Sequence, residues 1–108
     1  MNIRKIDEMY RGWFIGNFEP SIIKTADFEV ALLSHYKGED WPKHYHKEAD
    51  EVNVLLSGSM SVNGIELVPG DILHVEKNEI VDPIFHEDVK LICVKFPSVP
   101  GDKYEVSK

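Results

Sequence analysis

Hydrophobic and polar residues alternate with a period of two along most of the chain. Successive side chains of a β-strand point to opposite faces, so this pattern predicts short strands that each turn one face toward a core. No segment has the 3.6-residue period of a long helix, and we expect at most one helical turn, near Ile3–Tyr10 or Pro20–Thr25. The predicted strands are Trp13–Gly16, Phe28–Tyr36, His44–His46, Glu51–Ser57, Ser59–Val62, Ile65–Leu67, Ile72–Val75, Ile80–Phe85 and Val89–Phe96.

Turn residues separate these segments. Asn63-Gly64 lies between two alternating segments and predicts a two-residue type I′ hairpin turn, in which both central residues need positive φ. Val68–Asp71 contains Pro-Gly and predicts a second turn, and His86–Asp88 a third. Many short strands at close spacing favour an all-β sandwich or a closed barrel, which leaves few exposed edges.

The composition is uniform along the 108 residues, so we expect a single domain over residues 1–108. Residues 1–27 read as an N-terminal extension, whose aromatic cluster Trp13–Phe18 would pack on the barrel or across a dimer. The polar tail, residues 98–108, either wraps the domain or a neighbouring subunit in extended form or frays at its end.

Charge and apolar content narrow the possible partners. The chain has 12 Lys and Arg against 19 Asp and Glu, a net charge of −7, which disfavours nucleic acid. Apolar runs span only a few residues, so no membrane segment is expected, and the start lacks the apolar stretch of a secretory signal. The single cysteine, Cys93, lies in an apolar run and is expected to be a buried thiol. A reducing, cytoplasmic location fits best.

The candidate chemistry lies between Gly38 and Gly58. In a strand, His44 and His46 share one face, and beyond a turn Glu51 and Asn53 share a face that could meet them. Two neutral imidazoles and a carboxylate suit a divalent first-row metal such as Ni, Zn, Mn or Fe. A His-x-His pair alone is more often a surface feature than a binding site, and only the wider spacing favours the metal site.

That spacing resembles the first sequence motif of the cupins. Gly38, five residues, His44-Tyr45-His46, four residues, Glu51, six residues and Gly58 agree with the motif at each fixed position. The likeness extends from Phe28 to Pro97. It implies a small jelly-roll β-barrel, usually dimeric, that holds a metal inside the barrel on two histidines, a glutamate and a third histidine.

The second cupin motif is degraded in this chain. Counted from Gly70, the position of the third histidine falls on Val81, which cannot bind a metal, while Asn78 can replace a turn glycine. A one-residue bulge would instead offer Asp82 as a fourth ligand. Alternatively, water completes the site, or the pocket holds no metal. The other histidines, His35, His74 and His86, are weaker candidates.

Two further residues are assigned to the pocket. Asn53 is expected to point into the cavity beside Glu51, where it would bind a polar ligand or hydrogen-bond a neighbour. Trp41 is expected at the mouth of the barrel, as a stacking platform or a packed rim residue. The outward-facing Val52, Val54 and Leu56 need cover, which a symmetric homodimer would supply.

Two functions from different classes stay open. The first is a metal-dependent enzyme that acts on a small polar or sugar-like metabolite. The second is a non-catalytic binding or sensor domain with a degenerate, metal-free pocket, which the degraded second motif favours. A structural dimer module is a third reading, but it gives no reason for three convergent polar groups in a core. Because this fold serves many activities, it does not select among them.

Overall fold

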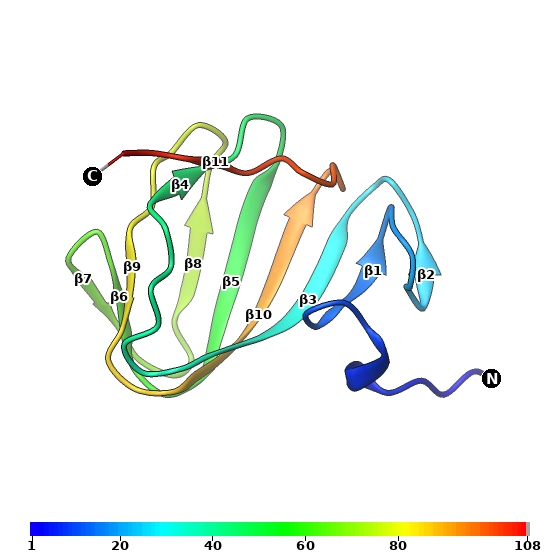
Figure 1. Ribbon diagram of the computed structural model, residues 1–108, viewed down its shortest axis with the longest axis horizontal. Helices are drawn as coiled ribbons and strands as arrows, with labels where there is room; N and C mark the ends of the chain where they lie inside the picture. The colour runs from blue at the N-terminus through cyan, green and yellow to red at the C-terminus, as the bar shows by residue number, and fades with distance from the viewer. Residues whose placement is uncertain (108) are drawn as a thin grey trace.

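The computed structural model describes residues 1–107, and its architecture is a flattened β-barrel (Figure 1). A six-stranded sheet forms one wall, in the order β2-β1-β3-β10-β5-β8, and β7-β6-β9 and β11-β4 form the other. The strands are β1 (Trp13–Gly16), β2 (Ile23–Lys24), β3 (Glu29–His35), β4 (His44–Tyr45), β5 (Asp50–Ser57), β6 (Met60–Val62), β7 (Ile65–Leu67), β8 (Ile72–Val75), β9 (Pro83–Phe85), β10 (Val89–Phe96) and β11 (Tyr104–Glu105).

The predicted all-β fold is confirmed, and most strand boundaries agree with the hydrophobic pattern. The predicted helical turn is a single 3₁₀ turn, η1 (Ile6–Glu8). Pro20–Thr25 contains the short strand β2 instead, which pairs in parallel with β1. The N-terminal segment thus extends the main sheet through β1 and β2. No helix in residues 1–107 is long and apolar enough to cross a membrane.

The turns take the predicted conformations. Asn63 and Gly64 have φ of 52° and 79°, as a type I′ hairpin requires, and join β6 to β7. Asn78 has φ of 70°, in the left-handed region that asparagine tolerates better than most residues. The strand predicted over Ile80–Phe85 is shorter, because the N–H of Asp82 donates to the Asn63 side chain at 2.8 Å and Pro83 has no N–H.

The apolar core lies between the two walls, toward the end of the barrel where β6, β9 and the start of β10 meet. Its buried members come from β5, β6, β9 and β10: Leu55, Met60, Val62, Phe85, Val89, Leu91 and Cys93. Cys93 is 1% exposed, which confirms the buried thiol. At the opposite end the interior becomes polar, and the candidate site lies there.

The tail crosses this polar end of the barrel. In Figure 1 it runs along the upper edge and reaches β4, where β11 pairs with it in antiparallel register. The rings of Tyr45 and Tyr104 stack with centroids 5.5 Å apart, and Lys47 Nζ lies 4.2 Å from the Tyr104 ring centre. The tail is therefore part of the fold, in line with the wrapping alternative.

Candidate metal and ligand site

Strand β4 turns both histidines of the His-x-His pair inward. His44 and His46 are 6% and 2% exposed, and the intervening Tyr45 packs outward on the tail. His44 exchanges two backbone hydrogen bonds with Val81, of 3.0 and 2.8 Å, which hold β4 against the segment before β9. The strand ends at Tyr45 because the carbonyl of His46 accepts instead from the N–H of Asn78, at 2.6 Å.

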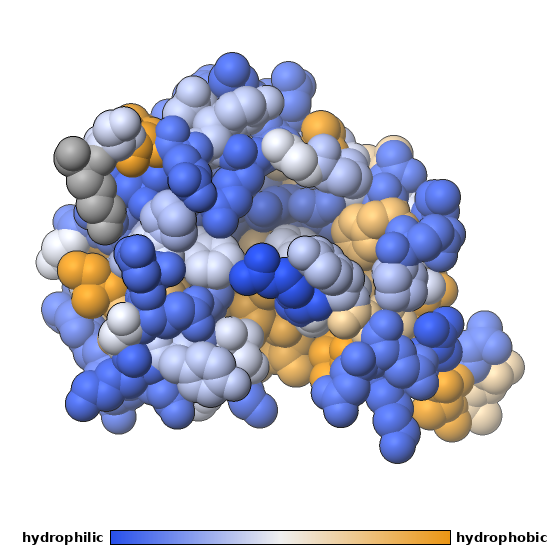
Figure 2. Space-filling model, in the orientation of Figure 1, coloured by the Kyte–Doolittle hydropathy of each residue, from blue (hydrophilic) through white to orange (hydrophobic). Residues whose placement is uncertain are grey.

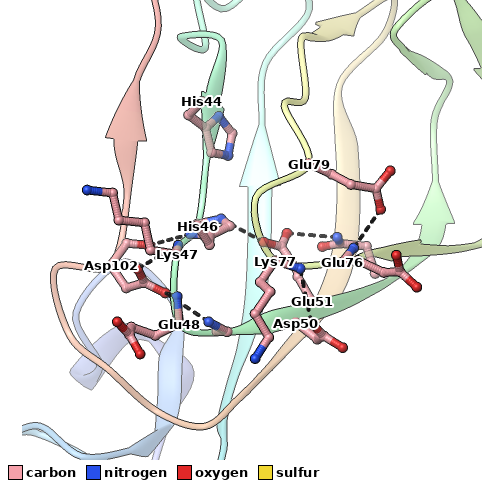
Figure 3. Close-up of polar contacts among 12 residues, drawn as sticks. His44, His46, Lys47, Glu48, Asp50, Glu51, Glu76, Lys77, Glu79 and Asp102 are labelled. Atoms are coloured by element: carbon pink, nitrogen blue, oxygen red, sulfur yellow. Dashed lines mark hydrogen bonds and ion pairs between the residues drawn. The ribbon is translucent and has the colours of Figure 1, made fainter.

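Glu51 comes from β5 and meets His46 inside the barrel (Figure 3). Its Oε2 lies 2.9 Å from His46 Nε2, and its Oε1 accepts a hydrogen bond of 2.8 Å from the Asn53 amide. Burial alone would raise the pKa of Glu51. Contact with His46, the positive charge of Lys95 and the Asn53 bond outweigh burial and lower the pKa to about 2, so Glu51 is a carboxylate at neutral pH.

Both imidazoles are held from behind by backbone carbonyls. Nδ1 of His46 donates to the carbonyl of Asp102, and Nδ1 of His44 donates to that of Pro42 at 2.7 Å. A carbonyl only accepts, so each Nδ1 carries a proton, and in the neutral ring Nε2 presents a lone pair. Burial, together with nearby positive charges, lowers the pKa of His44 and favours this neutral form. Backbone or carboxylate partners orient metal-binding histidines in the same way.

The Nε2 atom of His46 is the exception to a well-paired interior. It is buried and has no hydrogen-bond partner among residues 1–107, although Glu51 Oε2 approaches to 2.9 Å outside hydrogen-bond geometry. With a proton on Nε2, the contact is the attractive one that lowers the pKa of Glu51. With a neutral ring, the lone pair and the carboxylate repel unless a metal ion lies between them. As the residues stand, however, no three His, Cys, Asp or Glu side chains of the described chain converge into a ready metal site.

Asp102 supports this arrangement, and the sequence analysis missed it. Its carboxylate accepts the backbone N–H groups of Lys47, Glu48 and Ala49 at 2.9, 3.0 and 3.0 Å, and so closes the turn between β4 and β5. Burial acts to raise the pKa of Asp102, but these three bonds prevail and lower it. The only sequence signal is Val-Pro-Gly-Asp at Val99–Asp102, which repeats Val68–Asp71 and marks a turn but not its partner.

The remaining predicted site residues lie at different distances from this centre. Val81 lines the same cavity as the histidines and Glu51, in agreement with its alignment to the place of the third histidine. Asp82, the possible fourth ligand, is instead part of a separate shallow depression with Lys43, Asn63 and Ile80. Trp41 and Asn53 both line the main cavity.

Of the other histidines, only His35 reaches the cavity. Its Nδ1 lies 2.7 Å from Glu39, and its ring stacks on Phe85 and meets Trp41 edge-on. It stands at the end of β3 where that strand pairs with the start of β10, away from Glu51 at the far end of β10. His74 and His86 are exposed, near Asp50 and Glu66 respectively.

The cavity has a volume of about 830 Å³, within the range of small-molecule sites. Its wall is apolar toward the core and polar around the histidines and Glu51. Figure 2 shows a hollow in the middle of the face viewed, with hydrophilic side chains across it and apolar ones beside it. The chemistry of this interior, two imidazoles and a carboxylate beside an apolar wall, suits a small polar ligand.

Comparison of the structure with known proteins agrees with this architecture. No family model matches the sequence, and no curated protein matches it significantly. A conserved Klebsiella pneumoniae protein with a double-stranded β-helix domain is 21% identical, with a TM-score of 0.71 over 98% of this chain and 92% of its own.

Two further similar structures are described by the small molecule that the protein acts on or was solved with. The DMSP lyase DddQ from Ruegeria pomeroyi is 15% identical, with a TM-score of 0.73, over 87% of this chain; the match spans about half, 49%, of the lyase. The Streptomyces protein PAC13, solved with uridine, is 14% identical, with a TM-score of 0.66 over 77% of this chain and 71% of its own. Together with the other cupin structures that match, they show that this chain has the double-stranded β-helix fold of the cupins.

Proposed function

We propose that the cavity binds a divalent metal through His44, His46 and Glu51, and with it a small polar metabolite. The observation that carries this proposal is the buried Nε2 of His46, which faces the Glu51 carboxylate without a hydrogen bond. A metal cation between the two atoms would remove the repulsion of the neutral ring, and no Lys or Arg of residues 1–107 lies within ion-pair distance of Glu51. The fixed Nδ1 protons of both histidines direct the Nε2 lone pairs of the neutral rings to the cavity side.

The donor set fits such an ion. Two imidazole nitrogens and one carboxylate oxygen suit Ni, Zn, Mn or Fe, and leave positions for water or ligand. His46 Nε2 and Glu51 Oε2 lie 2.9 Å apart, so two of the three donor atoms already lie side by side. His44 has to approach this pair to complete the set, with its ring centre now 5.3 Å from that of His46.

In this proposal the residues have distinct roles. Glu51 and the two histidines hold the ion, Asn53 orients the Glu51 carboxylate, and Val81 leaves one side of the site apolar. When bound, the metal supplies Lewis-acid or redox chemistry to a carbonyl or hydroxyl of the metabolite. Trp41, on the cavity wall, offers an apolar surface for the rest of the ligand. The metabolite is small and polar, and a sugar derivative is one such class.

A non-catalytic binding or sensor domain is the second candidate. Its support is Val81, which stands where a third histidine would complete the ligand set. Of the two similar structures described above, one is a lyase and the other was solved with uridine. Turnover of a panel of sugars and keto acids by the metal-loaded protein would favour the enzyme, and reversible binding without turnover the sensor.

The metal content of the protein tests the shared core of both candidates. We expect protein purified without a His-tag to contain about one metal ion per chain by inductively coupled plasma mass spectrometry, or to take up one from Ni²⁺, Zn²⁺, Mn²⁺ or Fe²⁺. The His44→Ala/His46→Ala variant should lose it. His74→Ala/His86→Ala is the matched control, because both of these histidines are exposed and outside the cavity. Failure of the folded wild type to bind any of the four ions would overturn the metal site.

We also propose a homodimer formed through the outer face of the six-stranded sheet. Val52, Val54 and Leu56 of β5 turn to that face, and Leu56 is 49% exposed. On the neighbouring strand β8, Ile72 is the pairing partner of Val54 and is 69% exposed. A second copy would cover this apolar surface. Light scattering of the wild type at tens of micromolar should give twice the mass of one chain. Ile72→Asp should reduce the measured mass to that of one chain, whereas the control Ile3→Asp should leave it unchanged. A monomeric wild type would refute the dimer.

A further inference from the structure

Three cationic side chains from distant parts of the chain gather around the candidate site. Arg11 precedes β1, Lys95 lies near the end of β10 and Lys103 belongs to the tail, yet all three line the cavity. Lys103 Nζ lies 4.0 Å from the ring centre of Trp41, and the Arg11 guanidinium lies 5.6 Å from the same centre. Lys95 Nζ lies 5.1 Å from the Trp13 ring centre.

No carboxylate within residues 1–107 neutralises any of the three by an ion pair within 4.0 Å. This is unexpected in a chain with 19 acidic residues and a net charge of −7. Other cations do have acidic partners, since Arg4 pairs with Glu8 and Lys24 with Glu19. The aromatic faces hold the three cations in place, while Glu51 and Glu105 act on them only from beyond ion-pair distance.

The three charges also act on one another. Burial lowers the pKa of Lys103, and the positive charges of Lys95 and Arg11 lower it further, against the opposite effect of Glu105 and Glu51. Gathering like charges in a partly buried place costs free energy, which a counter-ion recovers. A bound anion would therefore be favoured at this point, even though the chain as a whole is acidic.

Lys95 lies between two glutamates of the neighbouring strands, and its charge acts on Glu51 without forming an ion pair. It alternates with Val94 and Phe96 on β10, and shares the inner face of the sheet with the buried Cys93. Its register partners on β5 and β3 are Glu51 and Glu29, and neither carboxylate pairs with its ammonium group. Lysine is rarely placed toward a barrel interior unless its charge has a partner there.

We propose that the cavity binds a small organic anion, whose carboxylate or phosphate group lies between Lys95 and Lys103, with Arg11 beside it. This names the charge class of the metabolite in the proposed function and rests on it, because the anion would occupy the same cavity as the metal. The arrangement also orients the ligand, since its charged end lies toward the lysines and its remainder toward the histidines and Glu51. An Arg guanidinium adds a bidentate partner for either anionic group.

Small probes test this charge preference directly. Succinate and inorganic phosphate, each at constant ionic strength set with KCl, should raise the Tm of the wild type and change its tryptophan fluorescence. The fluorescence should respond because the rings of Trp41 and Trp13 contact the three cations. The uncharged match of succinate, 1,4-butanediol, should do neither. No response of the wild type to either anion beyond that to KCl would overturn the proposal.

Variants locate the anion. In Lys95→Met/Lys103→Met, which keeps the apolar stems, succinate should bind at least about tenfold more weakly, because hydrogen bonds to charged groups are lost. Lys24→Met/Lys37→Met removes two exposed lysines outside the cavity and should bind succinate like the wild type. An unchanged affinity in the cavity double variant would overturn the proposal. Far-ultraviolet circular dichroism checks folding, and the wild-type comparison of succinate with butanediol does not depend on any variant.

The same titrations separate this proposal from the metal site. They are run on protein stripped with a chelator and then gel-filtered, and on His44→Ala/His46→Ala. If the protein binds no metal but still responds to anions through the two lysines, the anion proposal is supported and the metal proposal is refuted. If the protein binds metal but shows no such anion response, only the anion proposal is refuted.

Discussion

The main-chain carbonyl of Asp102 accepts the Nδ1 proton of His46, so a residue of the tail sets the orientation of a buried imidazole in the barrel. The same residue closes the turn after β4 with its carboxylate. The C-terminal segment is thus a structural part of the candidate site, although no residue of it belongs to the proposed metal-binding set. Its removal should disturb the site before it unfolds the barrel.

Asp102→Ala should therefore weaken both the fold and the site. Three N–H groups lose their acceptor, and one of them, of Ala49, is in a buried residue, so we expect a loss of about 1–3 kcal/mol in the free energy of unfolding. Urea denaturation measures this loss. Asp40→Ala, at an exposed position, should change it by no more than about 0.5 kcal/mol. Equal losses in the two variants would show that the turn does not depend on Asp102.

Two glycines of the cupin-like motif should differ sharply in their tolerance of alanine. Both have positive φ, 73° at Gly38 and 84° at Gly58, so each substitution costs about 1–2 kcal/mol of backbone strain. A Cβ on Gly58 would also lie 2.1 Å from the carbonyl oxygen of Asp88, whereas one on Gly38 meets nothing within 4 Å. Gly58→Ala should therefore lower the Tm much more than Gly38→Ala. Similar Tm values for the two variants would contradict the close approach of Gly58 to Asp88.

The pair of Glu39 and His35 should contribute to stability in a pH-dependent way. Burial acts to raise the pKa of Glu39, but the hydrogen bonds with His35 and the N–H of Tyr36 lower it below 4.5. A lowered folded-state pKa means that the contribution is complete above pH 4.5 and is lost as the pH falls through the folded-state value. The stability difference between the wild type and Glu39→Gln should thus be largest near neutral pH and shrink below pH 4.5. The exposed Glu48→Gln provides the comparison, and a difference that grows on acidification would argue against the pair.

Cys93 should resist thiol reagents in the folded protein. Burial, with the negative charge of Glu51 next, raises its pKa well above 9.0, and the residue is 1% exposed. Since the thiolate is the reactive form, we expect negligible modification by 5,5′-dithiobis(2-nitrobenzoate) at pH 8, and complete modification in denaturing urea. Fast modification of the native protein would mean that β10 opens readily at this point.

Several features of this protein follow from the sequence by itself. Alternation determines the inward direction of His44, His46 and Glu51, because strand geometry allows only two faces. Asn63-Gly64 specifies its hairpin through the positive φ that both residues accept. The spacing from Gly38 to Gly58 indicates the cupin fold. The count from Gly70 aligns Val81 with the place of a third histidine, and in the structure Val81 pairs with His44. These inferences are local, since each depends on neighbours in the chain.

Tertiary structure alone decided what the distant segments do. Val-Pro-Gly-Asp occurs twice, but the Asp71 carboxylate accepts the N–H of Val68 within its own turn, while that of Asp102 reaches a turn more than 50 residues away. Likewise, nothing in the spacing of Arg11, Lys95 and Lys103 predicts that they share one cavity. Such contacts depend on how the strands pair and how the tail crosses the barrel, and those arrangements result from the packing of the whole chain and not from any local pattern.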